Sequence, residues 1–466
     1  MKNANLHSVL STAEVGALAL LLGGCIAKST EDGYERVLHQ SAQLSPPTRL
    51  DAQERAREDD AELAGQPRLA TVLRLALLRN PELREARERV RASAARVMAK
   101  GRLPDPELKY EQWAVPLDRP YALDKAGMLM LGVRQSFPAP GSLDAESRAA
   151  LQEAEMTLEA QRARVRDLRA AVARAYFDYA RACAESEIRH EHERLATRVL
   201  ELARGQYLGG GGRQQDVLRL EVELSRAHGE LIELAAEQRS ARAQLNTLMA
   251  RNADAPLGTP PAPASAELQR SSAQLEAAML AQRPELASGA HAIERSKAML
   301  RAAHKTASLP SFMVGLDYWL MPQASNPHAY GAMVSMSLPW LNPQHDEEVR
   351  EAEHMLAAER SALEAARNGA RYELHDALAR YQAARDSLAI VDLALLGQTQ
   401  RSYEAAESAF ATGQGDAASV LDALRMYLDV RIEQNRARAR LQAALAEVER
   451  SASTELVEIT SDGRTP

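Results

Sequence analysis

An internal duplication limits the possible folds of this chain more than any other feature. Three pairs of short segments occur in the same order and differ at no more than one residue each: Asn80–Leu83 with Arg283–Leu286, Leu103–Pro104 with Leu309–Pro310, and Ser136–Pro138 with Ser337–Pro339. The members of a pair lie between 201 residues (Ser136 to Ser337) and 206 residues (Leu103 to Leu309) apart. A unit of about 200 residues therefore occurs twice, and the fold is expected to consist of two equivalent copies.

Each copy predicts the same succession of elements. A helix at 81–102 or 284–307 precedes two strands, at 105–114 and 127–137 or at 311–320 and 329–338. A long helix follows at 142–206 or 344–409, then a glycine-containing turn at 207–213 or 410–416, then a return helix at 214–250 or 417–450. At 1.5 Å per residue the long helix would reach about 97 Å. Such a length exceeds the diameter of a globular domain.

The composition of the long segments is that of coiled helices. Aromatic residues make up only 4% of the chain, and Val165, Leu168 and Val172 follow one another at steps of three and four. The net charge of −7 gives no reason to expect a nucleic-acid partner. We find no nucleophile elbow, P-loop or dinucleotide motif, so we expect no enzyme, no cofactor and no metal site. His190 and His192 would lie about 200° apart on a helix, and both are expected to be exposed.

The expected strands alternate with period two. Phe312, Val314 and Leu316 alternate with Met313 and other residues of the opposite face. Glu111 of the first copy aligns with Asp317 of the second on that mixed face. Segments of about ten residues that are apolar on one face and mixed on the other are typical of barrel strands between lipid and water. The alternative is a pair of solvent-facing hairpins on a helical protein.

The number of strands predicts an assembly. Four strands cannot close a barrel, because about eight are the practical minimum. Three chains would supply twelve strands, so we expect a homotrimer. The fold class is therefore mainly α with a small β part: two tandem repeats, four strands per chain and a 12-stranded barrel in the trimer.

The N-terminus resembles a bacterial lipoprotein signal. Leu22-Gly23-Gly24-Cys25 ends a short apolar run and matches a lipobox, so Cys25 is the expected lipid anchor. The alternative is an ordinary signal peptide with an incidental cysteine. Residue 26 is Ile rather than Asp, which favours the outer membrane.

These observations predict the domain boundaries. They are a signal peptide at 1–24, an extended N-terminal tail at 25–66, the first repeat at 67–250, a linker and equatorial segment at 251–282, the second repeat at 283–450 and a C-terminal tail at 451–466.

The order of elements in both repeats resembles that of the TolC-like outer-membrane efflux family. The most specific local marks are the two turns, Tyr207-x-x-Gly210 with Val217-Leu218 and Phe410-x-x-Gly413 with Val420-Leu421. The resemblance implies a passive export duct in the outer membrane of a Gram-negative bacterium, extending into the periplasm as an α-helical tunnel. Its partners would be a periplasmic adaptor, an inner-membrane pump and outer-membrane lipid.

Two sets of candidate site residues follow. The turns would form the periplasmic tip, which contacts the adaptor and acts as a gate: Tyr207, Gly210, Arg213, Val217, Leu218, Phe410, Gly413, Asp416, Val420 and Leu421. Arg213 aligns with Asp416, and pairs between them would hold the tip closed. Glu111 and Asp317 would form acidic rings in the lumen of a trimer and attract cations.

The alternatives to a channel are a periplasmic adaptor with a helical hairpin and a structural coiled-coil lipoprotein. Both would share the coiled helices and the lipobox. Neither has a reason to repeat barrel-like strands twice. The sequence does not identify the exported cargo, although the methionines and acids of the strands favour cations slightly.

Overall fold

The computed structural model describes residues 28–44, 60–115, 117, 121, 126–261, 268–322 and 324–454. The chain divides into two compact units. Unit 1 comprises Met1–Gln43, Arg87–Ala160 and Ala287–Ala366, and unit 2 comprises Leu44–Ala86, Gln161–Leu286 and Arg367–Pro466. Each unit contains parts of both copies, so the duplication does not coincide with the division into units.

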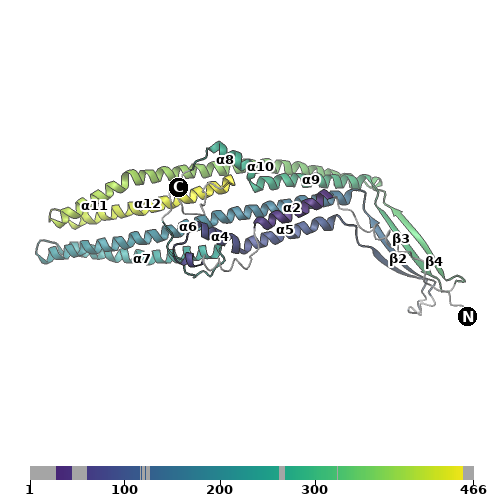
Figure 1. Cartoon of the computed structure of the whole chain (residues 1–466), viewed down its shortest axis with the longest axis horizontal. Helices are drawn as coiled ribbons and strands as arrows, with labels where there is room; N and C mark the ends of the chain where they lie inside the picture. The colour runs from purple at the N-terminus through teal and green to yellow at the C-terminus, as the bar shows by residue number, and fades with distance from the viewer. Residues whose placement is uncertain are drawn as a thin grey trace. The chain divides into compact units, whose positions relative to one another are not determined.

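The elements repeat in the predicted order (Figure 1). The first copy contains α4 (Leu69–Arg79), α5 (Pro81–Lys100), β1 (Glu107–Trp113), β2 (Met128–Phe137), α6 (Ser142–Leu208) and α7 (Gln214–Leu248). The second contains α8 (Ser272–Gln282), α9 (Pro284–Ser308), β3 (Phe312–Leu320), β4 (His328–Met336), the short 3-10 turn η2 (Pro339–Leu341), α10 (Gln344–Ile390), η3 (Val391–Leu395), α11 (Leu396–Ala411) and α12 (Ala417–Ala452). The predicted mainly helical class and all four strands are confirmed. The helices α4 and α8 were not predicted.

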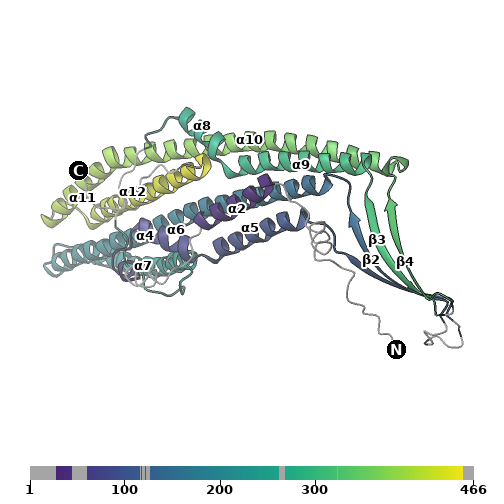
Figure 2. The ribbon, with the colours of Figure 1, turned by 45° about the vertical axis from the view of Figure 1, so that its right-hand side comes forward.

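Unit 1 contains one antiparallel sheet in the order β1-β2-β3-β4 (Figure 2). The pairing of β2 with β3 joins the two copies, with Gly132 opposite Asp317. β1 and β4 are the edges of the sheet, and each pairs on one side only within the chain. The sheet therefore has two backbone edges available for further strands.

Unit 2 contains two antiparallel helix pairs, α6 with α7 and α11 with α12 (Figure 1). A buried cluster around Leu200, Leu220 and Leu424 joins α6, α7 and α12 near the turns. Cys183 is buried in a second cluster. The stripe predicted from Val165, Leu168 and Val172 belongs to this same cluster.

The prediction of an extended tail at 25–66 is wrong for residues 28–44, which form the helix α2. Its buried residues, Thr30, Gly33, Val37 and Ser41, recur at helical spacing, but three of the four are small or polar. A Cβ on Gly33 would lie 2.6 Å from the side chain of Leu151, so α2 packs closely on α6. A search for apolar periodicity does not detect a helix of this kind. Residues 1–27, including Cys25, lie outside the described residues, and so do 455–466 of the predicted tail.

The second long helix is not continuous, contrary to the prediction. Val391–Leu395 form a π-helical turn between α10 and α11. The helices that begin at Ser142 and Gln344 start 202 residues apart, whereas Gly210 and Gly413 in the turns lie 203 apart. The second copy thus holds one extra residue in this stretch. A π turn is the usual way in which a helix accommodates a single inserted residue.

Within the described ranges, no helix combines the length and the apolar character needed to cross a bilayer.

Candidate functional site

One face of the sheet is apolar and exposed. Leu108, Val133 and Leu316 lie side by side on neighbouring strands and form one row across this face. They are 72%, 52% and 63% exposed. The next row holds Tyr110, Leu131, Tyr318 and Tyr330, all exposed. We call this the outer face.

The opposite face, here called the inner face, is mixed and charged. In the register of the sheet, Glu111 lies opposite Met130, and Asp317 lies in the neighbouring row opposite Gly132. The structure therefore places both predicted acids on one face, one row apart. Each has a cationic neighbour that the sequence reasoning did not consider. Lys109 forms an ion pair with Glu111, and the guanidinium of Arg134 lies 3.8 Å from Asp317 Oδ1.

Three glycines of the inner face make room for large neighbours. A Cβ on Gly132 would lie 2.0 Å from Asp317 Oδ1, and one on Gly331 would lie 2.4 Å from the ring of Trp319. A Cβ on Gly315 would lie 3.2 Å from the side chain of Arg134. Glycine inside a strand commonly marks such a close approach. Asp317 and Arg134 consequently lie flat against the sheet, with Asp317 only 7% exposed.

The two turns at the ends of the helix pairs have the same backbone geometry. Gly210 and Gly413 both have positive φ, of 79° and 73°. The amides of Gly211 and Gly212 donate to Gln206 O at 3.0 and 2.9 Å, and those of Gln414 and Gly415 donate to Ala409 O at 2.9 and 3.0 Å. These are the bonds that close a helix C-terminus through a left-handed glycine. The run Gly209–Gly212 thus forms the same turn as Thr412–Gly415.

Equivalent apolar residues of the two turns differ in burial. Phe410, Val420 and Leu421 of the second copy are 3%, 0% and 7% exposed. Tyr207 and Leu218, their counterparts in the first copy, are 45% and 53% exposed, and Val217 is partly buried. The hydrogen bond from Gln206 Nε2 to Phe410 O, of 2.8 Å, joins the two turns. The first turn therefore exposes large apolar side chains at positions where the second turn buries them.

The predicted partners Arg213 and Asp416 occupy equivalent positions but do not pair within the chain. Asp416 caps α12, and its Oδ1 accepts a 2.7 Å hydrogen bond from the amide of Ser419. Arg213 precedes α7 without a capping bond from its side chain. The bonds to Ser419 hold the pKa of Asp416 below its usual value, with a small contribution from the charge of Arg213. Asp416 thus has a structural role that the alignment did not reveal.

A buried polar cluster lies between the helices α6, α7 and α12, and the sequence did not predict it. His192 of α6 is only 4% exposed, so the expectation that it is exposed is wrong. Its Nε2 lies 3.3 Å from Oε1 of Glu223 in α7, and Glu223 also forms an ion pair with Arg425 of α12. The close approach of His192 and the bonds and charge of Arg425 outweigh the effect of burial and hold the pKa of Glu223 at about 2. One carboxylate therefore links three helices from both copies.

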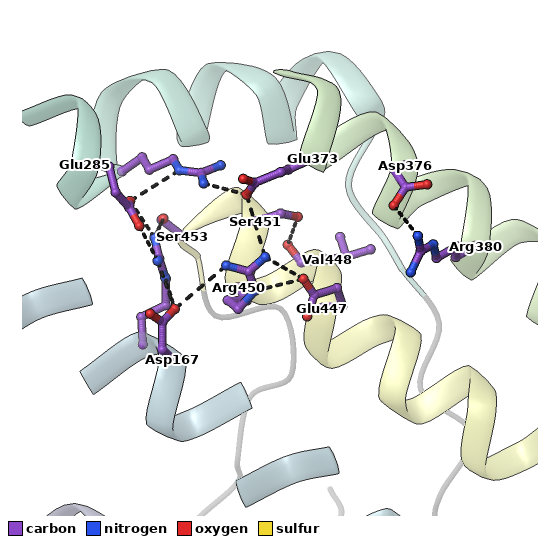
Figure 3. A network of polar contacts seen from close by, with 12 residues as sticks. Asp167, Glu285, Glu373, Asp376, Arg380, Glu447, Val448, Arg450, Ser451 and Ser453 are labelled. Carbon is purple, nitrogen blue, oxygen red and sulfur yellow. Dashed lines mark hydrogen bonds and ion pairs between the residues drawn. The ribbon is translucent and has the colours of Figure 1, made fainter. Parts of the chain in front are cut away.

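A second polar network joins the copies farther from the turns (Figure 3). Arg166 of α6 binds both carboxylate oxygens of Glu285 at the start of α9, at 2.8 and 2.5 Å. Burial opposes ionisation of Glu285, but the bonds from Arg166 prevail and hold its pKa at about 2. Arg450 of α12 contacts Glu447 and Glu373 (Figure 3). The network ties α6 to α9, α10 and α12 within unit 2.

Among the described residues, no three His, Cys, Asp or Glu side chains lie close enough together to hold a metal ion.

Comparison with known proteins identifies a family. The model of the family described as outer membrane efflux protein matches residues 72–251 and 275–453, one match for each copy. Comparison with curated proteins gave no significant match.

Solved structures share the fold. CusC, whose structures are described as showing transmembrane channel formation, superposes with a TM-score of 0.72 at 21% identity, over 83% of this chain and 92% of its own. The outer membrane protein VceC of Vibrio cholerae gives 0.69 at 16% identity, over 84% and 97%. The CmeC outer membrane channel of Campylobacter jejuni gives 0.70 at 15% identity, over 84% and 87%.

Proposed function

This chain belongs to the outer membrane efflux protein family, and on that premise we propose that it is one protomer of a trimeric, passive export duct. The duct would cross the outer membrane as a barrel and continue into the periplasm as a helical tunnel. A periplasmic adaptor and an inner-membrane pump would dock at the tip and supply the energy. The family membership disfavours the alternatives of a periplasmic adaptor and of a structural coiled-coil lipoprotein.

The observation that carries the proposal is the exposed apolar outer face of the sheet. Leu316 and Val334, in the middle of β3 and β4, are 63% and 70% exposed. A continuous apolar surface of this kind on a protein in water would promote aggregation. Facing lipid, it is the stable arrangement.

Two free sheet edges support the trimer. In lipid, unpaired N–H and C=O groups along β1 and β4 would each cost several kcal/mol, about what an unsatisfied buried amide costs. Pairing β4 of one protomer with β1 of the next removes both edges. Three copies give the twelve strands that the sequence analysis predicts, with the inner face toward the lumen.

The tip is the proposed docking and gating region. Tyr207 and Leu218 are exposed at the first turn and would meet the adaptor. Gating by Arg213 and Asp416 requires contacts between protomers, because the two residues do not pair within one chain. Asp416→Asn keeps an N-capping side chain while removing the charge. It therefore tests the gate better than Asp416→Ala, which would also remove the cap.

Planar-bilayer conductance of the detergent-purified protein tests the function. We expect discrete openings from the wild type, and larger or more frequent openings from Asp416→Asn if the charge holds the tip closed. If Asp416→Asn has the same conductance as the wild type, the proposed gate is contradicted but the proposed channel is not. Absence of openings from both proteins would contradict the channel itself.

The lipid anchor at Cys25 remains a separate proposal. Metabolic labelling with a radioactive fatty acid tests it, with Cys25→Ser as the unlabelled control. Label retained by Cys25→Ser would contradict it.

A further inference from the structure

The charges of the inner face form a mixed set. Among the described strand residues this face carries three acids and two bases: Glu107, Lys109, Glu111, Arg134 and Asp317. Arg134 lies directly opposite Glu107 in the register, and its guanidinium lies 3.8 Å from Asp317. Lys109 is paired with Glu111. The acids therefore do not form an uncompensated ring.

Arg134 and Asp317 are held together by the backbone beneath them. Asp317 lies over Gly132 and Arg134 lies over Gly315, in spaces that side chains at the two glycines would fill. Both side chains are largely buried, at 17% exposed for Arg134 and 7% for Asp317. Asp317 Oδ1 and Arg134 Nε have no hydrogen-bond partner, so the two groups interact through charge rather than through a hydrogen bond.

We propose that Arg134 sets the ion selectivity of the channel by neutralising Asp317 at the wall of the lumen. The inference rests on the proposed function, because it requires the inner face to line a pore. In a trimer, three Asp317 carboxylates would attract cations, and three Arg134 guanidinium groups in contact with them cancel most of that attraction. The acidic-ring prediction omitted this compensation.

The distance scale supports an effect on permeating ions. Charges act over roughly 8–10 Å in solutions of physiological salt. An unpaired carboxylate on the wall is therefore felt by ions within the lumen. A carboxylate with a cation 3.8 Å away presents little net field at that range.

Reversal potentials across a planar bilayer with a KCl gradient test the proposal. We expect Arg134→Gln to raise the K⁺/Cl⁻ permeability ratio by about twofold or more, and Asp317→Asn to lower it. The double variant Arg134→Gln/Asp317→Asn should return to near the wild-type ratio. Arg134→Lys keeps the charge and is the matched control, with an expected ratio like that of the wild type.

A variant that leaves every charge in place provides an independent check. In Gly132→Ala the new methyl group would occupy the position of Asp317 Oδ1 and displace the carboxylate from Arg134. The permeability ratio should move in the same direction as in Arg134→Gln. A wild-type ratio in Gly132→Ala would contradict the flat arrangement of the pair.

The outcomes separate this inference from the proposed function. Conducting channels with one and the same ratio in the wild type, Arg134→Gln and Asp317→Asn would overturn the role of Arg134 and leave the duct intact. A wild-type protein that never conducts would overturn both.

Discussion

Single glycines decide the shape of each turn, and the two copies supply matched controls for one another. Gly210 has positive φ, and a Cβ on Gly212 would lie 2.7 Å from the backbone nitrogen of Tyr207. Gly209 and Gly211 meet neither condition, since a Cβ at either has only ordinary contacts. Their counterparts in the second copy are Thr412 and Gln414.

We therefore expect Gly210→Ala to destabilise the turn by about 1 kcal/mol, because an L residue is strained there. Gly211→Gln reproduces the residue of the second copy, and should be neutral or stabilise the turn by about 0.5 kcal/mol. Hydrogen exchange of the amides of Gly211 and Gly212 measures the opening free energy in the first variant and the wild type. In Gly211→Gln, hydrogen exchange of the amide of Gly212 measures the opening free energy. Equal effects of the two substitutions would contradict the assigned geometry.

Glu223 makes the tip sensitive to acid. Its pKa of about 2 lies below the ordinary value of 4.5, so the stabilisation is fully present above about pH 4.5. It is lost progressively as the pH falls toward 2. Hydrogen exchange in α7 and α12 should accelerate over this range in the wild type. In Glu223→Gln, hydrogen exchange in α7 and α12 should not accelerate in this way as the pH falls. If it accelerates as much as in the wild type, other carboxylates cause the sensitivity to acid.

Substitution of Arg425 tests the stability of the same cluster at neutral pH. Arg425→Gln leaves the carboxylate of Glu223 buried without its guanidinium, which we expect to cost about 3 kcal/mol of local stability. Arg440 on the same helix forms an exposed pair with Glu433 at 2.9 Å, and Arg440→Gln should cost less than about 1 kcal/mol. Hydrogen exchange in α12 measures both, and similar costs would show that burial does not strengthen the first pair.

At the scale of elements, the π turn distinguishes the two long helices. Leu393 lies in this turn and is 88% exposed, so no core contact depends on it. The neighbouring Asp392 accepts a 2.6 Å hydrogen bond from Gln434 of α12. The extra residue therefore projects outward while the flanking helices keep their buried faces.

Deletion of Leu393 should convert Gln344–Ala411 into a continuous α-helix of the same length as α6, with assembly retained. Deletion of Ala196, which is fully buried in α6, is the control. It would rotate one part of α6 by about 100° relative to the other and misplace its buried face. Heat-resistant migration of the proposed trimer on gels reports assembly. Loss of trimers in the Leu393 deletion would show that the π turn is required.

At the scale of the whole molecule, the proposed function requires the outer face of the sheet to meet lipid and the inner face to meet the lumen. Leu316→Arg puts a charge in the middle of the outer face and should destabilise the barrel by about 2–4 kcal/mol. Met333→Arg, on the inner face two residues from Gly331, should be tolerated. The amount of the proposed trimer in the outer-membrane fraction measures the effect of each substitution. Equal yields would contradict the assignment of outer and inner faces.

The sequence by itself determined the duplication, the order of the elements, the strand faces and the turns. These features depend on local periods and on residues such as Gly210 and Gly413, whose backbone requirement is read directly from the chain. The sequence did not predict α2, because small residues rather than apolar ones make its buried face. It also did not predict the π turn, because a single inserted residue hardly disturbs the apolar period.

Only the tertiary structure decided which faces meet. Helical spacing places His192 and Glu223 on their helices, but it does not say that Arg425, about two hundred residues away, lies against them. Register likewise decides that Arg134 neutralises Asp317 across β2 and β3. Such pairs depend on contacts between distant segments, and no local period along the chain encodes those contacts.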